Sequence, residues 1–216
     1  PSVMVGHARN DICFLNDEEK IAKIRKKVAR FLDIDVNRQI FLYAPTKRDD
    51  VDESYDSLDY PLIKKALEER FGGKWQIVIR LHNRLKKESM MWLRDLPSYV
   101  SNATLYEDMQ ELLLCTDVGV TDYSSWIFDY VLSRKPGFIV ENGLEDFKES
   151  RGFYYPIETT PFPIAKDSVE LAERIRAFDE SKYLADVDRF LAERGCMEDG
   201  KASERIVEKI DELMKR

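Results

Sequence analysis

The sequence predicts an α/β protein built on a doubly wound parallel sheet. Short apolar runs recur along the first two thirds of the chain, and segments with helical periodicity separate them. Apolar runs without polar alternation are typical of strands buried on both faces. Strands that alternate with helices form right-handed βαβ units and hence a parallel sheet.

The strands can be placed from these runs in chain order. The first run ends at Pro45, as expected for a buried strand that leads into a loop. The expected strands are residues 39–44, 75–81, 117–120 and 138–140, with a brief further strand at Tyr99-Val100.

Helices are expected between and after the strands. Pro61 suits a first helical turn, and Gly72-Gly73 suit the residues after a helix end. Three amphipathic helices fill the last third of the chain. The expected helices are residues 61–70, 107–115, 124–134, 168–178, 182–193 and 202–214.

Composition limits the class of protein. The chain has 216 residues with 44% hydrophobic and 11% aromatic content, which is ordinary for a soluble globular protein. No apolar stretch approaches the ~20 residues that span a bilayer, and we expect no signal peptide. Cys13, Cys115 and Cys196 lie far apart and are odd in number, which favours a reducing cytosol.

The organisation of the chain favours one domain over residues 1–216. No internal repeat, low-complexity stretch or linker-like composition interrupts it. The chain begins at Pro1 without an initiator Met. We therefore expect an excised or processed piece with a partner domain upstream.

Charge is unevenly distributed along the chain. The formal net charge of −7 argues against nucleic-acid binding by the whole surface. Residues 20–30 nevertheless carry six Lys or Arg in a roughly helical stretch. That stretch could face an anionic surface. A solvated helix face is the favoured interpretation, since Asp17, Glu18 and Glu19 precede it as ordinary N-terminal helix charges.

Residues 121–130 are a candidate phosphate site. Asp122 follows a buried strand as a candidate helix N-cap, and Ser124 and Ser125 fall in the first turn. A helix N-terminus offers backbone N–H groups and a positive dipole end to a phosphate. Asp129 lies four residues past Ser125 on the same helix face. An ordinary capped helix, with an apolar face in the core, is a compatible reading.

Two further loops follow expected strands, where ligands of open α/β sheets bind. After the first strand, Thr46, Lys47 and Arg48 could neutralise a diphosphate; an exposed loop with ordinary ion pairs is the alternative. After the second strand, Arg80 and His82 point to one face. His82 could act as a general acid or base, or it could donate a hydrogen bond to a phosphate. Alternatively, it could be a structural histidine that caps the loop.

Other kinds of site are largely excluded. The sequence has no P-loop, no Gly-x-Gly-x-x-Gly, no cluster with zinc spacing and no Gly-x-Ser-x-Gly elbow. The polar segment Gly6–Asp11 could be a frayed tail. Residues 145–155 could form a lid or a packed loop.

In this order and spacing, these motifs resemble those of the CDP-glycerol glycerophosphotransferase family of teichoic acid polymerases and primases. The resemblance spans about residues 6–156. It rests on Gly6-His7-Ala8-Arg9-Asn10-Asp11, Tyr43-Ala44-Pro45-Thr46-Lys47-Arg48-Asp49, Arg80-Leu81-His82, Val120-Thr121-Asp122-Tyr123-Ser124-Ser125, Phe128-Asp129-Tyr130 and Arg151-Gly152-Phe153-Tyr154.

The resemblance implies a two-domain GT-B-type transferase of which this chain is the C-terminal, Rossmann-like donor-binding domain. Such enzymes transfer glycerol or ribitol phosphate from a CDP-alditol to a teichoic-acid-type or capsular polymer and release CMP. It implies a polymer or lipid-linked acceptor, no metal, no cofactor and no nucleic acid. We expect a cytoplasmic location, with the inner face of the membrane as the narrower alternative. The isolated chain is expected to bind donor without turnover.

The resemblance also assigns roles to residues. His82 is the catalytic residue that assists departure of the phosphate. The pyrophosphate is held by Ser124, Ser125 and the amides after Asp122, beside Thr46, and neutralised by Lys47, Arg48 and Arg80. Asp129 binds a donor hydroxyl. A GT-B glycosyltransferase for another nucleotide sugar and a non-catalytic α/β binding domain are the alternatives.

Overall fold

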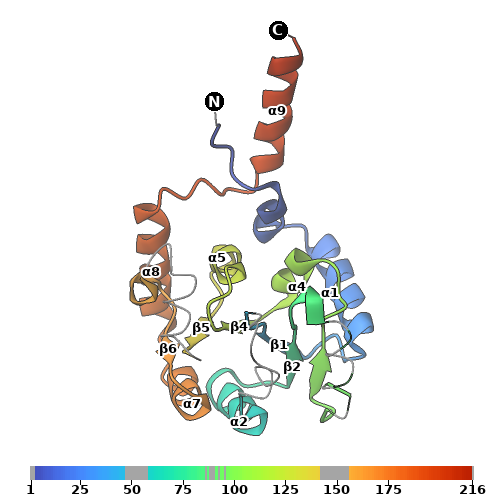
Figure 1. Ribbon diagram of the computed structural model, residues 1–216, viewed down its shortest axis with the longest axis vertical. Coiled ribbons are helices and arrows are strands. Elements are labelled where there is room, and N and C mark those ends of the chain that lie inside the picture. The colour runs from blue at the N-terminus through green and yellow to red at the C-terminus, as the bar shows by residue number, and fades with distance from the viewer. Residues whose placement is uncertain are drawn as a thin grey trace.

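A six-stranded parallel sheet forms the centre of the protein (Figure 1). The computed structural model describes residues 3–46, 58–85, 87, 91, 93–94, 96–141 and 156–215. The spatial order is β3-β2-β1-β4-β5-β6 with every pair parallel. This confirms the predicted fold class. The strands are β1 (Gln39–Tyr43), β2 (Trp75–Ile79), β3 (Val100–Asn102), β4 (Val118–Thr121), β5 (Gly137–Val140) and β6 (Ile164–Ala165).

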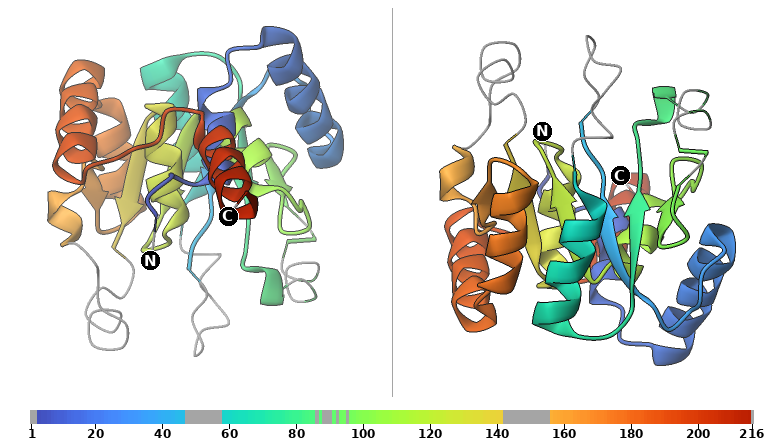
Figure 2. Two further views of the ribbon diagram at one scale, coloured as in Figure 1. Left: turned by 90° about the horizontal axis from the view of Figure 1, so that it is seen from above. Right: turned by 90° about the horizontal axis from the view of Figure 1, so that it is seen from below.

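Helices cover both faces of the sheet. In Figure 1, α2 and α7 lie below the sheet, and α1, α4 and α5 lie above it. Figure 2 shows α2 in front of the sheet in the view from below, and α9 in front in the view from above. The α-helices are α1 (Glu18–Leu32), α2 (Tyr60–Phe71), α4 (Met109–Cys115), α5 (Trp126–Tyr130), α7 (Ser168–Arg176), α8 (Glu180–Glu193) and α9 (Ala202–Met214). The 3-10 helices are η1 (Ala8–Phe14), η2 (Asn83–Leu85), η3 (Val131–Ser133) and η4 (Ile157–Thr159).

The core lies between the sheet and its two helical layers. Residues of the central strands, such as Leu42, Ile77 and Val120, are completely buried, as their unbroken apolar runs predict. Gly119 permits an unusually close approach of α5 to β4. A Cβ atom at this position would lie only 2.8 Å from the ring of Tyr130, so any larger residue would displace the helix.

Aspartates fix the start of most helices. Each one accepts a hydrogen bond from a backbone amide in the first turn, which is worth about 1 kcal/mol per helix. These caps are Asp17 for α1, Asp59 for α2, Asp108 for α4, Asp167 for α7 and Asp179 for α8. Helix α5, which follows the two serines, has no such cap among the described residues.

Several elements depart from the sequence prediction, among them a helix and a strand near the carboxyl edge of the sheet. The helix expected over residues 124–134 is shorter, because α5 begins at Trp126 and passes into η3 at Val131. The two-residue strand β6 was not predicted, since so short a pairing leaves no periodic pattern.

The order of the strands places a topological switch point between β1 and β4. The chain leaves β1 toward one edge of the sheet and leaves β4 toward the other. Ligands of open α/β sheets bind beyond the carboxyl ends of the strands at such a point. The loops that begin at Ala44 and Asp122 meet there.

Candidate functional site

The loops after β1 and β4 are bonded directly to each other. The backbone amide and the hydroxyl of Thr46 both donate to Asp122 Oδ1, each at 2.7 Å. The indole N–H of Trp126 and the hydroxyl of Thr121 donate to the carbonyl of Ala44, at 2.8 and 2.9 Å. These bonds hold the start of α5 against the end of β1.

The predicted role of Asp122 as a helix N-cap is wrong. Ser125 occupies the N-cap position of α5, and no side-chain cap bond is present among the described residues. Asp122 is buried, with 2% of its surface exposed, and its carboxylate turns to the amide and hydroxyl of Thr46. A buried carboxylate needs donors, and Thr46 supplies two of them.

The two serines differ in what they face. The backbone amides of Ile127 and Phe128 donate hydrogen bonds to the carbonyls of Ser124 and Ser125. These two amides of the turn are therefore already engaged within the protein. No hydrogen bond within the described residues engages either serine hydroxyl. Ser124 lines one pocket, and Ser125 lines another on the far side of α5.

The first of these pockets, here called the switch-point pocket, has a volume of about 190 Å³. It brings together Arg80, His82 and Ser124, three predicted site residues from two loops. Its lining consists of Ala44, Pro45, Arg80, Leu81, His82, Met109, Ser124 and Trp126.

Arg80 is fixed at the side of this pocket. One terminal nitrogen of its guanidinium donates to the carbonyl of Tyr106 at 2.6 Å. Burial lowers the pKa of Arg80, while the nearby charge of Asp108 raises it. The side chain remains cationic, because an arginine pKa lies far above neutrality. A fixed, partly desolvated cation is suited to a diphosphate.

His82 makes a structural contact within its loop and also lines the pocket. Its Nδ1 accepts a hydrogen bond from the amide of Arg84 at 3.2 Å, so the ring caps the loop, as in the structural alternative. An accepting Nδ1 places the proton of the neutral ring on Nε2. The exposed ring lines the pocket, where Nε2–H can donate to a phosphate oxygen.

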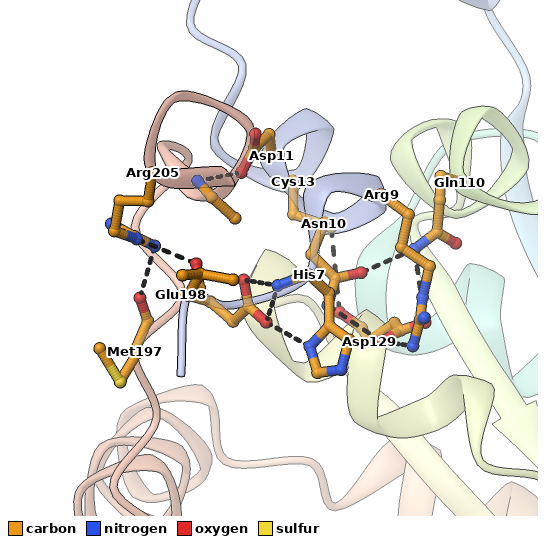
Figure 3. Close-up of polar contacts among 12 residues, drawn as sticks. His7, Arg9, Asn10, Asp11, Cys13, Gln110, Asp129, Met197, Glu198 and Arg205 are labelled. Atoms are coloured by element: carbon orange, nitrogen blue, oxygen red, sulfur yellow. Dashed lines mark hydrogen bonds and ion pairs between the residues drawn. The ribbon is translucent and has the colours of Figure 1, made fainter. Parts of the chain in front are cut away.

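Asp129 lies on the other side of α5 and is already bound by protein groups. Arg9 donates to its two oxygens at 3.0 and 3.2 Å, and Asn10 donates to Oδ1 at 3.0 Å (Figure 3). Gln110 bonds the Asn10 side chain at 2.8 Å and reaches Asp129 at 3.4 Å. The predicted contact of Asp129 with a donor hydroxyl stays a prediction; in the structure its carboxylate joins α5 to η1.

The second pocket, here called the flank pocket, has a volume of about 570 Å³ and lies beside Asp129. Phe128 is 38% exposed there and stacks on Phe190, with ring centroids 6.1 Å apart. Ser125 and His7 also line it, together with residues 3–6 and 194–198. Its lining is mainly apolar, whereas the switch-point pocket holds Arg80, His82 and Ser124 beside its apolar residues.

The segment over residues 5–11, here called the N-terminal strap, is not a frayed tail. Glu198 accepts from the amide of His7 at 3.0 Å and contacts its Nδ1 at 2.7 Å. Arg205 donates to the carbonyl of Val5 at 2.9 Å. Asp11 accepts from the amides of Ala202 and Ser203, both at 2.9 Å, and so caps α9 (Figure 3).

Several of these contacts could not be read from the sequence. Gln110 and Glu198 lie 100 and 191 positions from their partners in the strap, and no local spacing links them. Among the predicted residues, Lys47 and Arg48 lie outside the described part of the chain, as do residues 151–154. Within the described residues, no group of three or more His, Cys, Asp or Glu could hold a metal ion.

A doubly wound sheet with polar groups from two loops at its switch point defines a Rossmann-like domain of the kind that binds phosphorylated ligands. Residues 2–212 match the model of one family, described as CDP-Glycerol:Poly(glycerophosphate) glycerophosphotransferase. The chain belongs to this family, as the sequence motifs indicate.

Known relatives include enzymes for two alditols. A teichoic acid poly(glycerol phosphate) polymerase of Staphylococcus epidermidis is 29% identical over 210 residues, which are 94% of this chain and 28% of that protein. A teichoic acid poly(ribitol-phosphate) polymerase of Bacillus spizizenii is 28% identical over 214 residues, 96% of this chain and 33% of that protein. The chain thus spans about a third of these relatives.

The fold is also found in a solved relative. A structure of the wall teichoic acid polymerase TagF, after a 30 minute soak with CDPG, superposes with a TM-score of 0.74 at 25% identity. The match covers 99% of this chain and 51% of that chain. The likeness supports the Rossmann-like architecture across the whole length described here.

Proposed function

We propose that this chain is the donor-binding domain of a CDP-alditol phosphotransferase. The enzyme would transfer glycerol phosphate or ribitol phosphate from the CDP-alditol to a polymer or lipid-linked acceptor and release CMP. Family membership supports the reaction class. The single observation that carries the proposal is the convergence of Arg80, His82 and Ser124 on the switch-point pocket.

The pocket suits the charge changes of this reaction. An acceptor hydroxyl oxygen attacks the phosphorus that carries the alditol, the bond to the bridging oxygen breaks, and CMP departs with added negative charge. The Ser124 hydroxyl and the Arg80 cation would hold the diphosphate, and His82 Nε2–H would donate to the departing phosphate. Donors fixed before reaction stabilise such charge without reorganisation.

The other predicted residues take supporting positions in this proposal. Thr46 and Asp122 would hold the loops together through their two bonds. Lys47 and Arg48 would add positive charge from the loop after β1. Ser125 would reach the diphosphate from the flank side of α5. The base that accepts the hydroxyl proton, together with the acceptor site, is assigned to a further domain of the parent protein.

Location is part of the proposal as well. No helix among the described residues is long and apolar enough to cross a membrane. We propose a cytoplasmic parent that works at the inner face of the membrane, where a lipid-linked acceptor would be presented.

Isothermal titration tests the donor assignment with CDP-glycerol, CDP-ribitol and UDP-glucose. We expect a CDP-alditol to bind most tightly, and Ser124→Ala to weaken it about tenfold, since a hydrogen bond to a charged group contributes roughly 1.5–3 kcal/mol. Ser181→Ala, on the exposed face of α8, is the matched control. Tighter binding of UDP-glucose would favour a glycosyltransferase, and no binding of any nucleotide would favour a non-catalytic domain.

A further inference from the structure

We propose that the exposed face of α1 docks on an anionic lipid bilayer. This face, here called the basic face, consists of Lys20, Lys23, Lys26, Lys27 and Arg30. The inference rests on the proposed membrane location and names the surface that would provide it.

The basic face stands out against the charge of the whole chain. Helix α1 holds six Lys or Arg against two Glu, a net charge of +4, in a chain whose net charge is −7. Arg25 is the one cation of α1 that turns inward, where it donates to the carbonyls of Val36, Arg38 and Cys115. The other five are exposed.

Most of this charge is not neutralised by neighbours. Lys23 pairs with Glu19 and Lys27 with Glu111, each at 2.6 Å, but these two lysines are still 73% and 60% exposed. Lys20, Lys26 and Arg30 have no ion pair with any described residue. A cluster of this kind attracts anionic lipid through its charge.

Exposed apolar side chains at the end of the basic face favour a bilayer over a soluble polyanion. Phe31 is 44% exposed and Leu105 is 41% exposed. Phe31 leans edge-on against Tyr106, with ring centroids 5.0 Å apart. Both line a groove of about 780 Å³ beside Lys27. Aromatic and aliphatic side chains next to lysines are typical of surfaces that enter the headgroup region, and the charged backbone of a polyanion does not bury them.

The groove connects the basic face to the candidate site. Met109 lines both this groove and the switch-point pocket, and Arg80 donates to the carbonyl of Tyr106 between them. Glu107 and Asp108 line the groove as well, so they limit the lipid-facing surface on that side. Docking through α1 would hold the donor pocket near the membrane.

Vesicle flotation tests the proposal with the full chain. We expect binding to vesicles of phosphatidylglycerol and phosphatidylcholine, none to pure phosphatidylcholine, and release at high salt because ions screen the attraction. Replacing Lys20, Lys26 and Arg30 by Gln should weaken binding roughly 100-fold, since each Lys or Arg near an anionic surface contributes about 1 kcal/mol, or roughly fivefold.

The matched control removes the same charge elsewhere. Lys74, Lys166 and Lys215 are exposed, lie outside α1 and have no ion pair with a described residue. Their replacement by Gln should leave vesicle binding within about threefold. Equal losses of vesicle binding in the two triple variants would overturn the proposal. Equal binding of the unsubstituted chain to neutral and anionic vesicles would overturn it as well.

A fluorescent reporter separates a bilayer from a polyanion. Phe31→Trp should show a blue shift with anionic vesicles and none with heparin or RNA. A shift with neither ligand, despite binding, would contradict the proposal. CDP-glycerol titration of the α1 triple variant separates the two proposals: unchanged donor affinity with lost vesicle binding supports both. If the unsubstituted chain binds CDP-glycerol but no vesicles, only the membrane-docking proposal is overturned.

Discussion

Helix α5 has two sides that the protein uses differently. On one side, Ser124 lines the switch-point pocket with Arg80 and His82, and no described residue engages its hydroxyl. On the other side, Asp129 is bound by Arg9 and Asn10. Two motif residues five positions apart, one just before α5 and one within it, therefore have different surroundings. We infer that one side is kept open for ligand and that the other anchors the helix.

The largest expected effect comes from breaking the anchored side. Asp129→Ala leaves the Arg9 and Asn10 side chains without their shared acceptor, and we expect a loss of about 2 kcal/mol in the free energy of unfolding. Urea denaturation measures this. Asp211→Ala, on the exposed surface of α9, is the control and should change the free energy by less than about 0.5 kcal/mol.

The same variant decides between the two roles of Asp129. If Asp129 only anchors the helix, the affinity of the folded variant for CDP-glycerol should fall by less than about threefold. If Asp129 binds a donor hydroxyl, the loss of that hydrogen bond should lower the affinity further. Unchanged stability with a tenfold loss of affinity would show that the carboxylate serves the donor and that the two sides of α5 work together.

A smaller effect is expected from the open side. His82→Ala removes a donor to the departing phosphate and should weaken CDP-glycerol binding about tenfold, or 1.4 kcal/mol, by calorimetry. Its bond with the Arg84 amide is exposed, so stability should fall by less than about 1 kcal/mol. A large loss of stability with normal affinity would mean that His82 only caps its loop.

The two sides also differ in how much the sequence reveals. The open side depends on strand ends, which buried runs such as Gln39–Tyr43 and Trp75–Ile79 mark clearly, and on the rule that parallel strands end at one edge. The sequence therefore places Arg80, His82 and Ser124 correctly at that edge. Its local capping rule fails at Asp122, because a tertiary contact with Thr46 competes for the same carboxylate.

The anchored side could not be predicted in the same way. Its bonds join Arg9 to Asp129 and His7 to Glu198 across most of the chain, and neither periodicity nor capping rules reach that far. From the sequence alone, Gly6–Asp11 was compatible with a frayed tail. Only the folded arrangement shows that this polar segment is tied to both α5 and α9.

The smallest expected effect is a pH dependence of the cap on α9. Burial raises the pKa of Asp11, but hydrogen bonds from Ser203 and Ala202 and the charge of Arg205 outweigh it and lower the pKa below 3.8. A carboxyl group with a lowered pKa in the folded state adds stability that is complete above the unfolded pKa and is lost as pH falls through the folded one.

Hydrogen exchange and denaturation measure this loss. Protection of the Ala202 and Ser203 amides should stay constant from about pH 7 to pH 5 and fall below the ordinary carboxyl range near pH 4. The Asp11→Asn variant should lack this pH-dependent loss of stability. Its free energy of unfolding should therefore converge with that of the unsubstituted chain in acid. Parallel curves at all pH values would mean that the strap holds α9 through Glu198 and Arg205 alone. The anchored side would then be independent of the Asp11 charge.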